Sequence, residues 1–100
     1  MKNKPSKSEQ TKIKKQVRER DEFSCQHCGC WLGDSRGDVH HIVYLSRGGT
    51  WELWNLLLIC GELDNPECIA HWKIHNGHLY CKTVSKSPFQ VEFSSDKFED

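Results

Sequence analysis

The feature that most constrains how this chain can fold is its set of six cysteines within only 100 residues. A domain of this size buries too little apolar surface for a hydrophobic core alone to be secure. Small domains therefore commonly rely on disulfides, a bound metal or a partner. Hydrophobic residues make up only 36% of the chain, so the cysteines are expected to supply either disulfides or metal ligands.

The N-terminal residues lack the apolar run of a secretory signal, and nowhere does the chain approach the roughly 18 apolar residues of a membrane helix. We therefore expect a cytoplasmic protein with no membrane partner. A reducing cytosol favours metal-bound thiolates over disulfides. A disulfide-rich secreted domain is the weaker interpretation.

The spacing of the cysteines agrees with a metal site. Cys25 and Cys28 form a C-x2-C knuckle, a tight turn in which two thiolates reach one zinc ion, and a second pair, Cys60 and Cys68, follows downstream. Four thiolates would complete a tetrahedral structural zinc site with no open position. A C-x2-C motif can also be a redox motif, but no thioredoxin-like βαβ pattern surrounds this one.

Two cysteines remain outside this set. Cys30 could replace Cys28 as a ligand, and Cys81 could replace Cys68. For each of the two, a free buried thiol is the simpler interpretation, since unpaired cysteines commonly pack as small apolar residues.

The first part of the chain predicts a basic helix. Residues 9–22 are good helix formers, with Ile13 and Val17 four residues apart as a thin apolar stripe. Ser8 is the expected N-cap. Residues 1–8 are expected to form a disordered basic tail.

The zero net charge of the chain hides an asymmetry. Residues 1–20 hold eight basic and two acidic residues, a net charge of +6, whereas residues 91–100 have a net charge of −3. A basic arm suits a polyanion such as nucleic acid. From charge alone, a solvated tail explains the same residues equally well.

Residues 23–82 are expected to form one domain. Within it, residues 39–45 are rich in β-branched side chains and predict a strand. One helical turn is expected at 51–55, and 56–60 reads as a short buried strand or the end of that turn.

Helix signals frame the last part of this domain. Asn65 can act as an N-cap, Pro66 fits the first helical position, and Gly77 follows the last turn. After that helix, residues 83–100 are expected to be an irregular tail, with at most a short strand near Phe89–Phe93.

Four histidines and an asparagine stand out. His40 and His41 are neighbours within the predicted strand, so their side chains point to opposite faces. His71 and His75 stand four residues apart on the predicted helix and share a face, which is a chelating spacing. Asn55 lies in the segment between these pairs. Any one of them could be an ordinary structural residue, so only their combination indicates a catalytic site.

In this order, the segments "CQHC", "DVHHIVYLSRGGTWELWNLLLIC" and "ECIAHWKIHNG" resemble the HNH endonucleases, in the zinc-knuckle branch common in phages and bacteria. The resemblance covers about residues 17–77. It implies a small α+β protein with the ββα-metal fold, in which a two-stranded hairpin packs on a helix around one divalent ion. The structural zinc knuckle would support this unit, and the N-terminal basic helix would precede it.

The resemblance also implies roles for individual residues. His41 would be the general base that activates water, since a neutral imidazole suits that task near neutral pH. His40, His71 and His75 would hold the catalytic ion, a Lewis acid for the phosphate and the leaving oxygen. Asn55 would either brace its loop or join the metal shell, and the residues leave both open.

The chain departs from the family pattern in two places. Many relatives have Asp where this chain has His40, and an imidazole ligand moves the preference from Mg²⁺ toward Zn²⁺, Ni²⁺ or Mn²⁺. Relatives usually have Cys directly before the helix His, whereas Cys68 precedes His71 by three residues. On one continuous helix Cys68 would crowd the catalytic ion, a conflict that disappears if the helix begins only after Cys68.

The sequence thus predicts a metal-dependent HNH endonuclease that hydrolyses DNA in a bacterial or phage-infected cell, where other phage or restriction proteins are possible partners. The first alternative is a non-catalytic, zinc-stabilised DNA-binding module, and the second is a protein-interaction module. Contacts to DNA phosphates are expected from five basic side chains: Arg47, Lys73, Lys14, Lys15 and Arg18.

Overall fold

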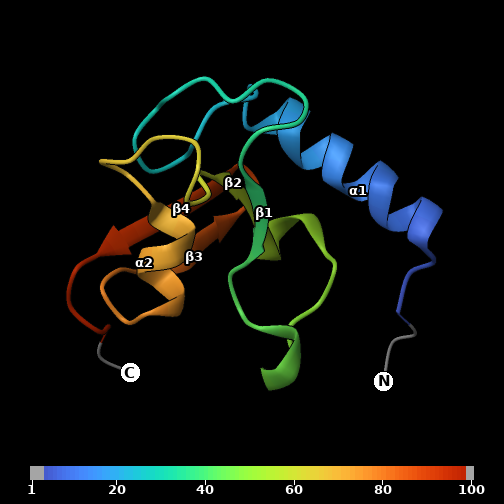
Figure 1. Cartoon of the computed structure of the whole chain (residues 1–100). Coiled ribbons are helices and arrows are strands. Elements are labelled where there is room, and N and C mark those ends of the chain that lie inside the picture. Colours follow the sequence, from blue (N-terminus) through green and yellow to red (C-terminus); the bar gives the residue numbers. More distant parts are fainter. Residues whose placement is uncertain (1–3, 99–100) are drawn as a thin grey trace.

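The computed structural model describes residues 4–98 and shows a small α+β protein, as the sequence predicts (Figure 1). In that part of the chain, no helix is long and apolar enough to cross a membrane. Two antiparallel two-stranded sheets are present. The elements are helix α1 (Lys7–Arg20), strands β1 (Asp38–His41) and β2 (Leu56–Ile59), helix α2 (Ala70–His75), and strands β3 (Tyr80–Lys86) and β4 (Phe89–Ser94).

Helix α1 starts and ends two residues earlier than expected. Ser6, not Ser8, is the N-cap, because Ser6 and Glu9 form a capping box in which each side chain accepts a hydrogen bond from the other residue's backbone N–H. The helix stops where Glu22 and Phe23 adopt positive φ angles of 56° and 57°. Of the expected disordered tail 1–8, residues 7 and 8 are therefore helical, and residues 1–3 lie outside the described residues.

Strands β1 and β2 form the centre of the molecule. His40 pairs with Leu57 and His41 with Leu56, and all four residues of β2 are completely buried. The predicted strand 39–45 ends at His41, and the chain then enters a loop with a short 3-10 helix over Leu45–Arg47. The helical turn expected at 51–55 is present as a 3-10 helix over Leu53–Asn55.

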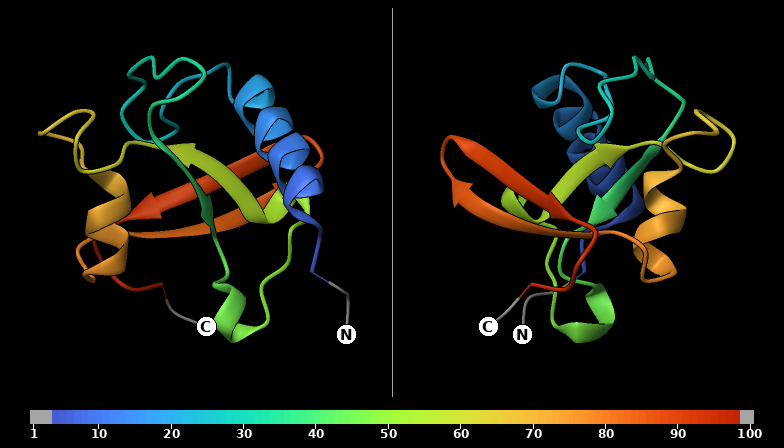
Figure 2. Two further views of the ribbon diagram at one scale, coloured as in Figure 1. Left: turned by 45° about the vertical axis from the view of Figure 1, so that its right-hand side comes forward. Right: turned by 90° about the vertical axis from the view of Figure 1, so that its left-hand side faces the viewer.

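Helices α1 and α2 lie on opposite sides of strand β1 (Figures 1 and 2). Since neighbouring side chains of a strand point to opposite faces, His40 points toward α2 and His41 toward the α1 side. The contacts described below agree with this placement, so His40 and His41 lie in different environments on the two faces of β1.

Helix α2 is shorter than the helix signals suggest. Asn65 forms a turn, its side-chain Oδ1 accepting a hydrogen bond from Glu67 N at 3.1 Å, instead of capping a helix. Ile69 has a left-handed backbone conformation with a φ angle of 35°, so the helical conformation begins only after it, at Ala70. Gly77 follows the end of the helix at His75, as expected.

The expected irregular tail 83–100 is instead largely a β-hairpin, in which the short strand expected near Phe89–Phe93 is present as β4. Strands β3 and β4 pair from Tyr80 to Ser94, so the anticipated domain end at residue 82 falls inside a strand. The hairpin alternates half-buried Thr83 and Ser85 with exposed Lys82 and Val84. Its inner face is thus partly polar, which weakens the apolar alternation by which strands are recognised.

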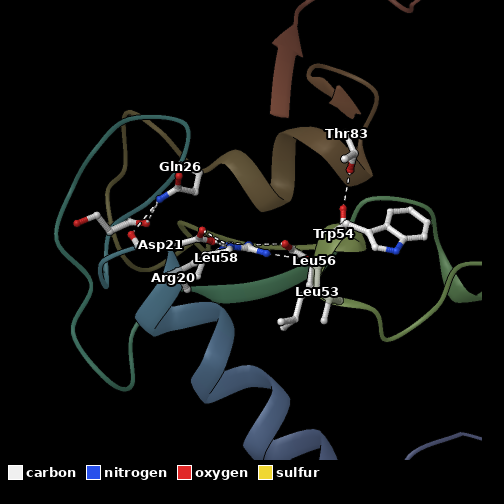
Figure 3. A network of polar contacts seen from close by, with 9 residues as sticks. Arg20, Asp21, Gln26, Leu53, Trp54, Leu56, Leu58 and Thr83 are labelled. Atoms are coloured by element: carbon white, nitrogen blue, oxygen red, sulfur yellow. Dashed lines mark hydrogen bonds and ion pairs between the residues drawn. The ribbon is translucent and has the colours of Figure 1, made fainter. Parts of the chain in front are cut away.

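A polar network joins α1 to both sheets (Figure 3). Arg20 makes two hydrogen bonds with the Asp21 carboxylate, at 2.8 and 2.9 Å, and two with main-chain carbonyls at 2.6 Å each. Asp21 Oδ2 also accepts a hydrogen bond from Leu58 N of β2 at 2.9 Å. The guanidinium lies 3.9 Å from the ring centroid of Phe89 in β4. These contacts fix α1 against the central sheet.

Candidate metal centres

Four cysteine sulfurs converge between the knuckle, the end of β2 and the turn before α2. The ligand atoms of Cys25, Cys28, Cys60 and Cys68 all lie within 4.8 Å of one another. Two pairs of sulfurs, Cys25 with Cys68 and Cys28 with Cys60, are 3.7 Å apart. Four sulfurs placed tetrahedrally at about 2.3 Å from one zinc ion would be about 3.8 Å apart. This cluster could therefore bind a metal such as zinc.

Backbone N–H groups surround the sulfurs of this cysteine cluster. Cys25 Sγ accepts from the backbone N–H of His27, Cys28 and Cys60, each at 3.4 Å. Burial alone would raise the pKa of Cys28, but hydrogen bonds from Cys30 N–H and from the neighbouring thiols lower that pKa to about 7. Burial and the neighbouring thiols instead raise the pKa of Cys60 and Cys68, so the backbone N–H groups are the donors that favour thiolate. Such donors stabilise thiolate, the form that binds metal.

The interruption at Ile69 removes the conflict between Cys68 and His71. Because α2 begins at Ala70, Cys68 belongs to the preceding turn and faces the cysteine cluster, while His71 lies on the helix. Of the two remaining cysteines, neither belongs to this group. Cys30 contacts the carbonyl of Trp31 at 3.6 Å, and burial raises the pKa of Cys81 to about 11.

A second group consists of His40, His71 and His75, whose ligand nitrogens also lie within 4.8 Å of one another. His71 Nε2 and His75 Nε2 are 3.0 Å apart. The ring centroid of His40 lies 5.2 Å from that of His71 and 5.5 Å from that of His75. Two nitrogens that bind one ion at about 2.0–2.1 Å lie about 3.0–3.4 Å apart, so this donor set fits a divalent metal.

His40 is the buried member of the histidine group. It is only 2% exposed, and its Nε2 is buried without a hydrogen-bond partner. Burial first, and then the neighbouring histidines, lower the pKa of His40 to about 3. A neutral buried imidazole with an unused lone pair is a form that ligates metals.

Two residues that sequence reasoning did not single out support the helix histidines. Asp38 Oδ2 lies 2.8 Å from Nδ1 of His71, and the Tyr44 ring stacks on His75 with centroids 5.2 Å apart. Asp38 stands two positions before His40, so an alternating strand places both on one face. That spacing was a usable signal for Asp38, whereas nothing in the sequence pointed to Tyr44.

His41 lies on the other face of β1. Its ring meets Trp51 edge to face, with centroids 4.5 Å apart, and its Nε2 is buried without a partner. Burial first, and then the positive charge of Lys14 on α1, lower the pKa of His41. The structure thus does not bring His41 into the histidine group with His40.

Asn55 braces the loop that connects β1 to β2. Its side chain accepts a hydrogen bond from Val43 N at 2.8 Å and donates to the carbonyls of Val43 at 3.1 Å and Thr50 at 2.9 Å. Asn55 is completely buried. Of the two roles left open by the sequence, these contacts are those of a brace.

An open cleft of about 550 Å³ adjoins the histidine group and is lined by His71, His75, Trp72 and three carboxylates, among other residues. The carboxylates are Asp38, Glu62 and Asp64. The cleft leaves the two helix histidines accessible from outside, whereas three of the four clustered cysteines are buried and only Cys28 is exposed.

The basic residues expected to contact DNA differ in whether their side chains already make hydrogen bonds within the protein. Arg47, Lys14 and Lys15 are exposed. Arg18 instead donates hydrogen bonds to the carbonyls of Gly33, Arg36 and Gly37, at 3.2, 2.7 and 3.5 Å, which makes it a support of that loop. Lys73 Nζ donates to the Glu67 carbonyl at 3.3 Å.

Comparisons with known proteins point to a family for this chain. The family model described as HNH endonuclease matches residues 25–62, from the knuckle through both strands of the central sheet. Anaredoxin from Nostoc sp. (strain PCC 7120 / SAG 25.82 / UTEX 2576) is 32% identical over 71 residues, which are 71% of this chain and 82% of that protein. No solved structure matches.

The chain belongs to the HNH endonuclease family, which confirms the resemblance found in its sequence. Helix α2, with His71 and His75, lies beyond the matched segment. The family therefore accounts for β1, Asn55 and three of the clustered cysteines, while the histidine group rests on the structure.

Proposed function

We propose that this protein is a metal-dependent endonuclease that hydrolyses phosphodiester bonds of DNA. The observation that carries this proposal is the convergence of His40, His71 and His75 beside an open cleft, in a chain of the HNH family. In this proposal the β1–β2–α2 unit is a ββα-metal unit, and the cysteine cluster is its structural zinc site.

The three histidines would hold the catalytic ion, with Zn²⁺, Ni²⁺ or Mn²⁺ favoured over Mg²⁺ because the ligands are imidazoles. A bound divalent ion supplies Lewis-acid stabilisation of the phosphate and the leaving oxygen. The cleft beside His71 and His75 leaves room for substrate oxygens. The four cysteines offer no such open position, which suits a structural role.

His41 is the proposed general base. Burial and then Lys14 lower its pKa, which favours the neutral form that a base requires, and its Nε2 has no hydrogen-bond partner within the protein. Asn55 holds the following loop in place and thereby supports the backbone around His41.

Exposed cations would bind the DNA backbone around this site. Lys14, Lys15 and Arg47 are free to reach phosphates, and Lys14 also lies 6.0 Å from the centroid of the Trp51 ring, next to His41. Contacts of this kind give affinity and orientation without reading sequence.

One observation favours a second candidate, a non-catalytic DNA-binding module stabilised by zinc. His41 Nε2 lies buried against Trp51 on the face of β1 opposite the histidine group. In this candidate the histidine group is a second structural site, and no water is activated.

A plasmid-cleavage assay separates the two candidates. Purified protein is incubated with supercoiled plasmid and with Mg²⁺, Mn²⁺, Ni²⁺ or Zn²⁺, and nicked and linear products are counted. We expect cleavage by the wild type and its loss in His41→Ala, by at least about 100-fold because general-base catalysis contributes that much. DNA affinity, measured by fluorescence anisotropy, should be unchanged.

His78→Ala is the matched control, because His78 is exposed, stacks on Trp72 with centroids 5.5 Å apart and belongs to neither group of candidate metal ligands. It should cleave like the wild type. DNA binding without cleavage under every metal would establish the non-catalytic module instead. Absence of DNA binding even at low salt would exclude both and leave a protein-interaction module.

A further inference from the structure

Asp38 occupies a position that neither the cysteine cluster nor the proposed chemistry uses. It is the first residue of β1, on the same face as His40, and its side chain reaches α2 across the cleft. Its Oδ2 lies 2.8 Å from Nδ1 of His71. The Asp38 side chain is 48% exposed and that of His71 is 28% exposed, so this is a contact at the edge of the cleft.

We propose that Asp38 is a positioning residue that fixes the ring of His71 in the form needed to bind a metal ion. The inference rests on the proposed function only in that the histidine group binds a divalent ion. In this arrangement the Asp38 carboxylate accepts the hydrogen of His71 Nδ1. His71 Nε2 then carries a lone pair, and that nitrogen faces the other two histidines.

The number of N–H groups on the imidazole rings of His71 and His75 supports this assignment. A neutral imidazole has one N–H, so a hydrogen on Nδ1 of His71 leaves Nε2 as an acceptor. His75 Nε2 lies 3.0 Å from His71 Nε2, and in the metal-free chain it must then donate the hydrogen between them. The other tautomer of His71 would place a hydrogen on Nε2, where the ion is expected, and would set the Nδ1 lone pair against the carboxylate.

Close packing holds the Asp38 carboxylate in place despite its exposure. A Cβ atom added to Gly61 would lie 2.7 Å from Asp38 Oδ2, so the carboxylate rests directly on the backbone after β2. That backbone is held by Asp64, whose Oδ2 accepts hydrogen bonds from Gly61 N at 2.8 Å and Gly37 N at 3.0 Å.

The geometry argues against Asp38 as a ligand of the same ion. Its contact is with Nδ1, whereas the nitrogen of His71 that faces His75 is Nε2. The lone-pair directions of the two ring nitrogens diverge, so an ion on Nε2 and a carboxylate oxygen on Nδ1 lie on different sides of the ring. Carboxylates in this outer position orient metal-binding histidines and raise their basicity.

The test measures the tautomer of His71 and the affinity for Ni²⁺, which binds readily to imidazoles. The full chain is used with zinc supplied at one equivalent for the cysteine cluster and the histidine group left empty. Side-chain ¹⁵N NMR at pH 8 reports which nitrogen of each histidine carries hydrogen, because ordinary histidines are neutral there. Calorimetric titration with NiCl₂ gives the affinity.

Asp38→Ala and Asp38→Asn are compared with Glu62→Gln, a control that removes a carboxylate of the same cleft. The wild type and Glu62→Gln should both show His71 with hydrogen on Nδ1 and should bind Ni²⁺ within about twofold of each other. Asp38→Ala should shift His71 toward the Nε2–H form and bind Ni²⁺ about 10- to 100-fold more weakly. Asp38→Asn should have a smaller effect on both, because its amide oxygen can still accept the hydrogen of Nδ1. Circular dichroism verifies that each variant is folded.

Two results would overturn the proposal. Weaker binding with an unchanged His71 tautomer would make Asp38 a direct ligand, and equal binding by Asp38→Ala and Glu62→Gln would make its contact with His71 unimportant. Failure of the plasmid assay is a separate outcome, because the tautomer and the Ni²⁺ affinity are measured without DNA.

Discussion

Replacing Asp21 by Asn tests the polar network that joins α1 to the central sheet. Asp21 Oδ2 accepts hydrogen bonds from both Arg20 Nη2 and Leu58 N, and Oδ1 accepts from Arg20 Nε. An Asn side chain has one oxygen and one NH₂ group. In either orientation the NH₂ group therefore faces an N–H donor, and the charge that pairs with Arg20 is lost.

The magnitude follows from burial. Breaking a buried ion pair by removing one partner costs about 3–5 kcal/mol. The Asp21 side chain is 2% exposed but that of Arg20 is 23% exposed, so solvent screens part of the remaining charge, and two carbonyls still accept from it. We therefore expect Asp21→Asn to lower the free energy of unfolding by about 2–3 kcal/mol, or the melting temperature by about 10–20 °C.

Urea denaturation followed by circular dichroism, with a fixed excess of zinc, measures this change. The matched control is Glu92→Gln, which breaks the Lys82–Glu92 pair at 3.8 Å, where both side chains are about half exposed. That change should cost at most about 1 kcal/mol. If Asp21→Asn costs no more than Glu92→Gln, the network is not what fixes α1 to the sheet.

Two further predictions concern the cysteines and the basic residues. The double variant Cys30→Ser, Cys81→Ser should still bind one zinc ion at the cysteine cluster, whereas Cys68→Ser should lose tight zinc binding. Mass spectrometry under native conditions measures the number of zinc ions bound per chain. A lower number in the double variant would contradict the assignment of the four ligands. Lys14→Gln with Lys15→Gln should reduce the slope of log affinity for duplex DNA against log salt concentration by about 2, because each lost phosphate contact removes about 0.9. An unchanged slope would mean that α1 does not contact DNA.

The elements with short-range signals were predictable from sequence. The knuckle, the buried run of β2 and the turn at Leu53–Asn55 each follow from local spacing or composition, and all are present. The helix boundaries were less predictable, because the capping box of Ser6 competes with Ser8, and because the positive φ of Ile69 has no signature in its side chain. Of the β3–β4 hairpin, only a short strand near Phe89–Phe93 was predicted, because the inner face of β3 is partly polar.

The candidate site also combines residues that local spacing predicts with contacts that it does not predict. Adjacent histidines in a strand and an i, i+4 pair on a helix bring His40, His71 and His75 together through simple periodicity. Contacts that depend on the path of a loop could not be read from spacing. Neither the stacking of Tyr44 on His75 nor the contact of His41 with Trp51 has a local pattern, since each joins residues whose distance is decided by tertiary structure.

Because His40 and His41 are adjacent, the pairing register of β1 and β2 matters more than the identity of most residues in these strands. Sliding β1 by a single residue along β2 would exchange the two imidazoles between the sides of the sheet, leaving the composition intact and the chemistry misplaced. The hydrogen bonds between Asn55 and the backbone of Val43 tie the end of β1 to the start of β2 and oppose such slippage. One deleted residue in β1 is therefore more disruptive than many exchanges of side chain.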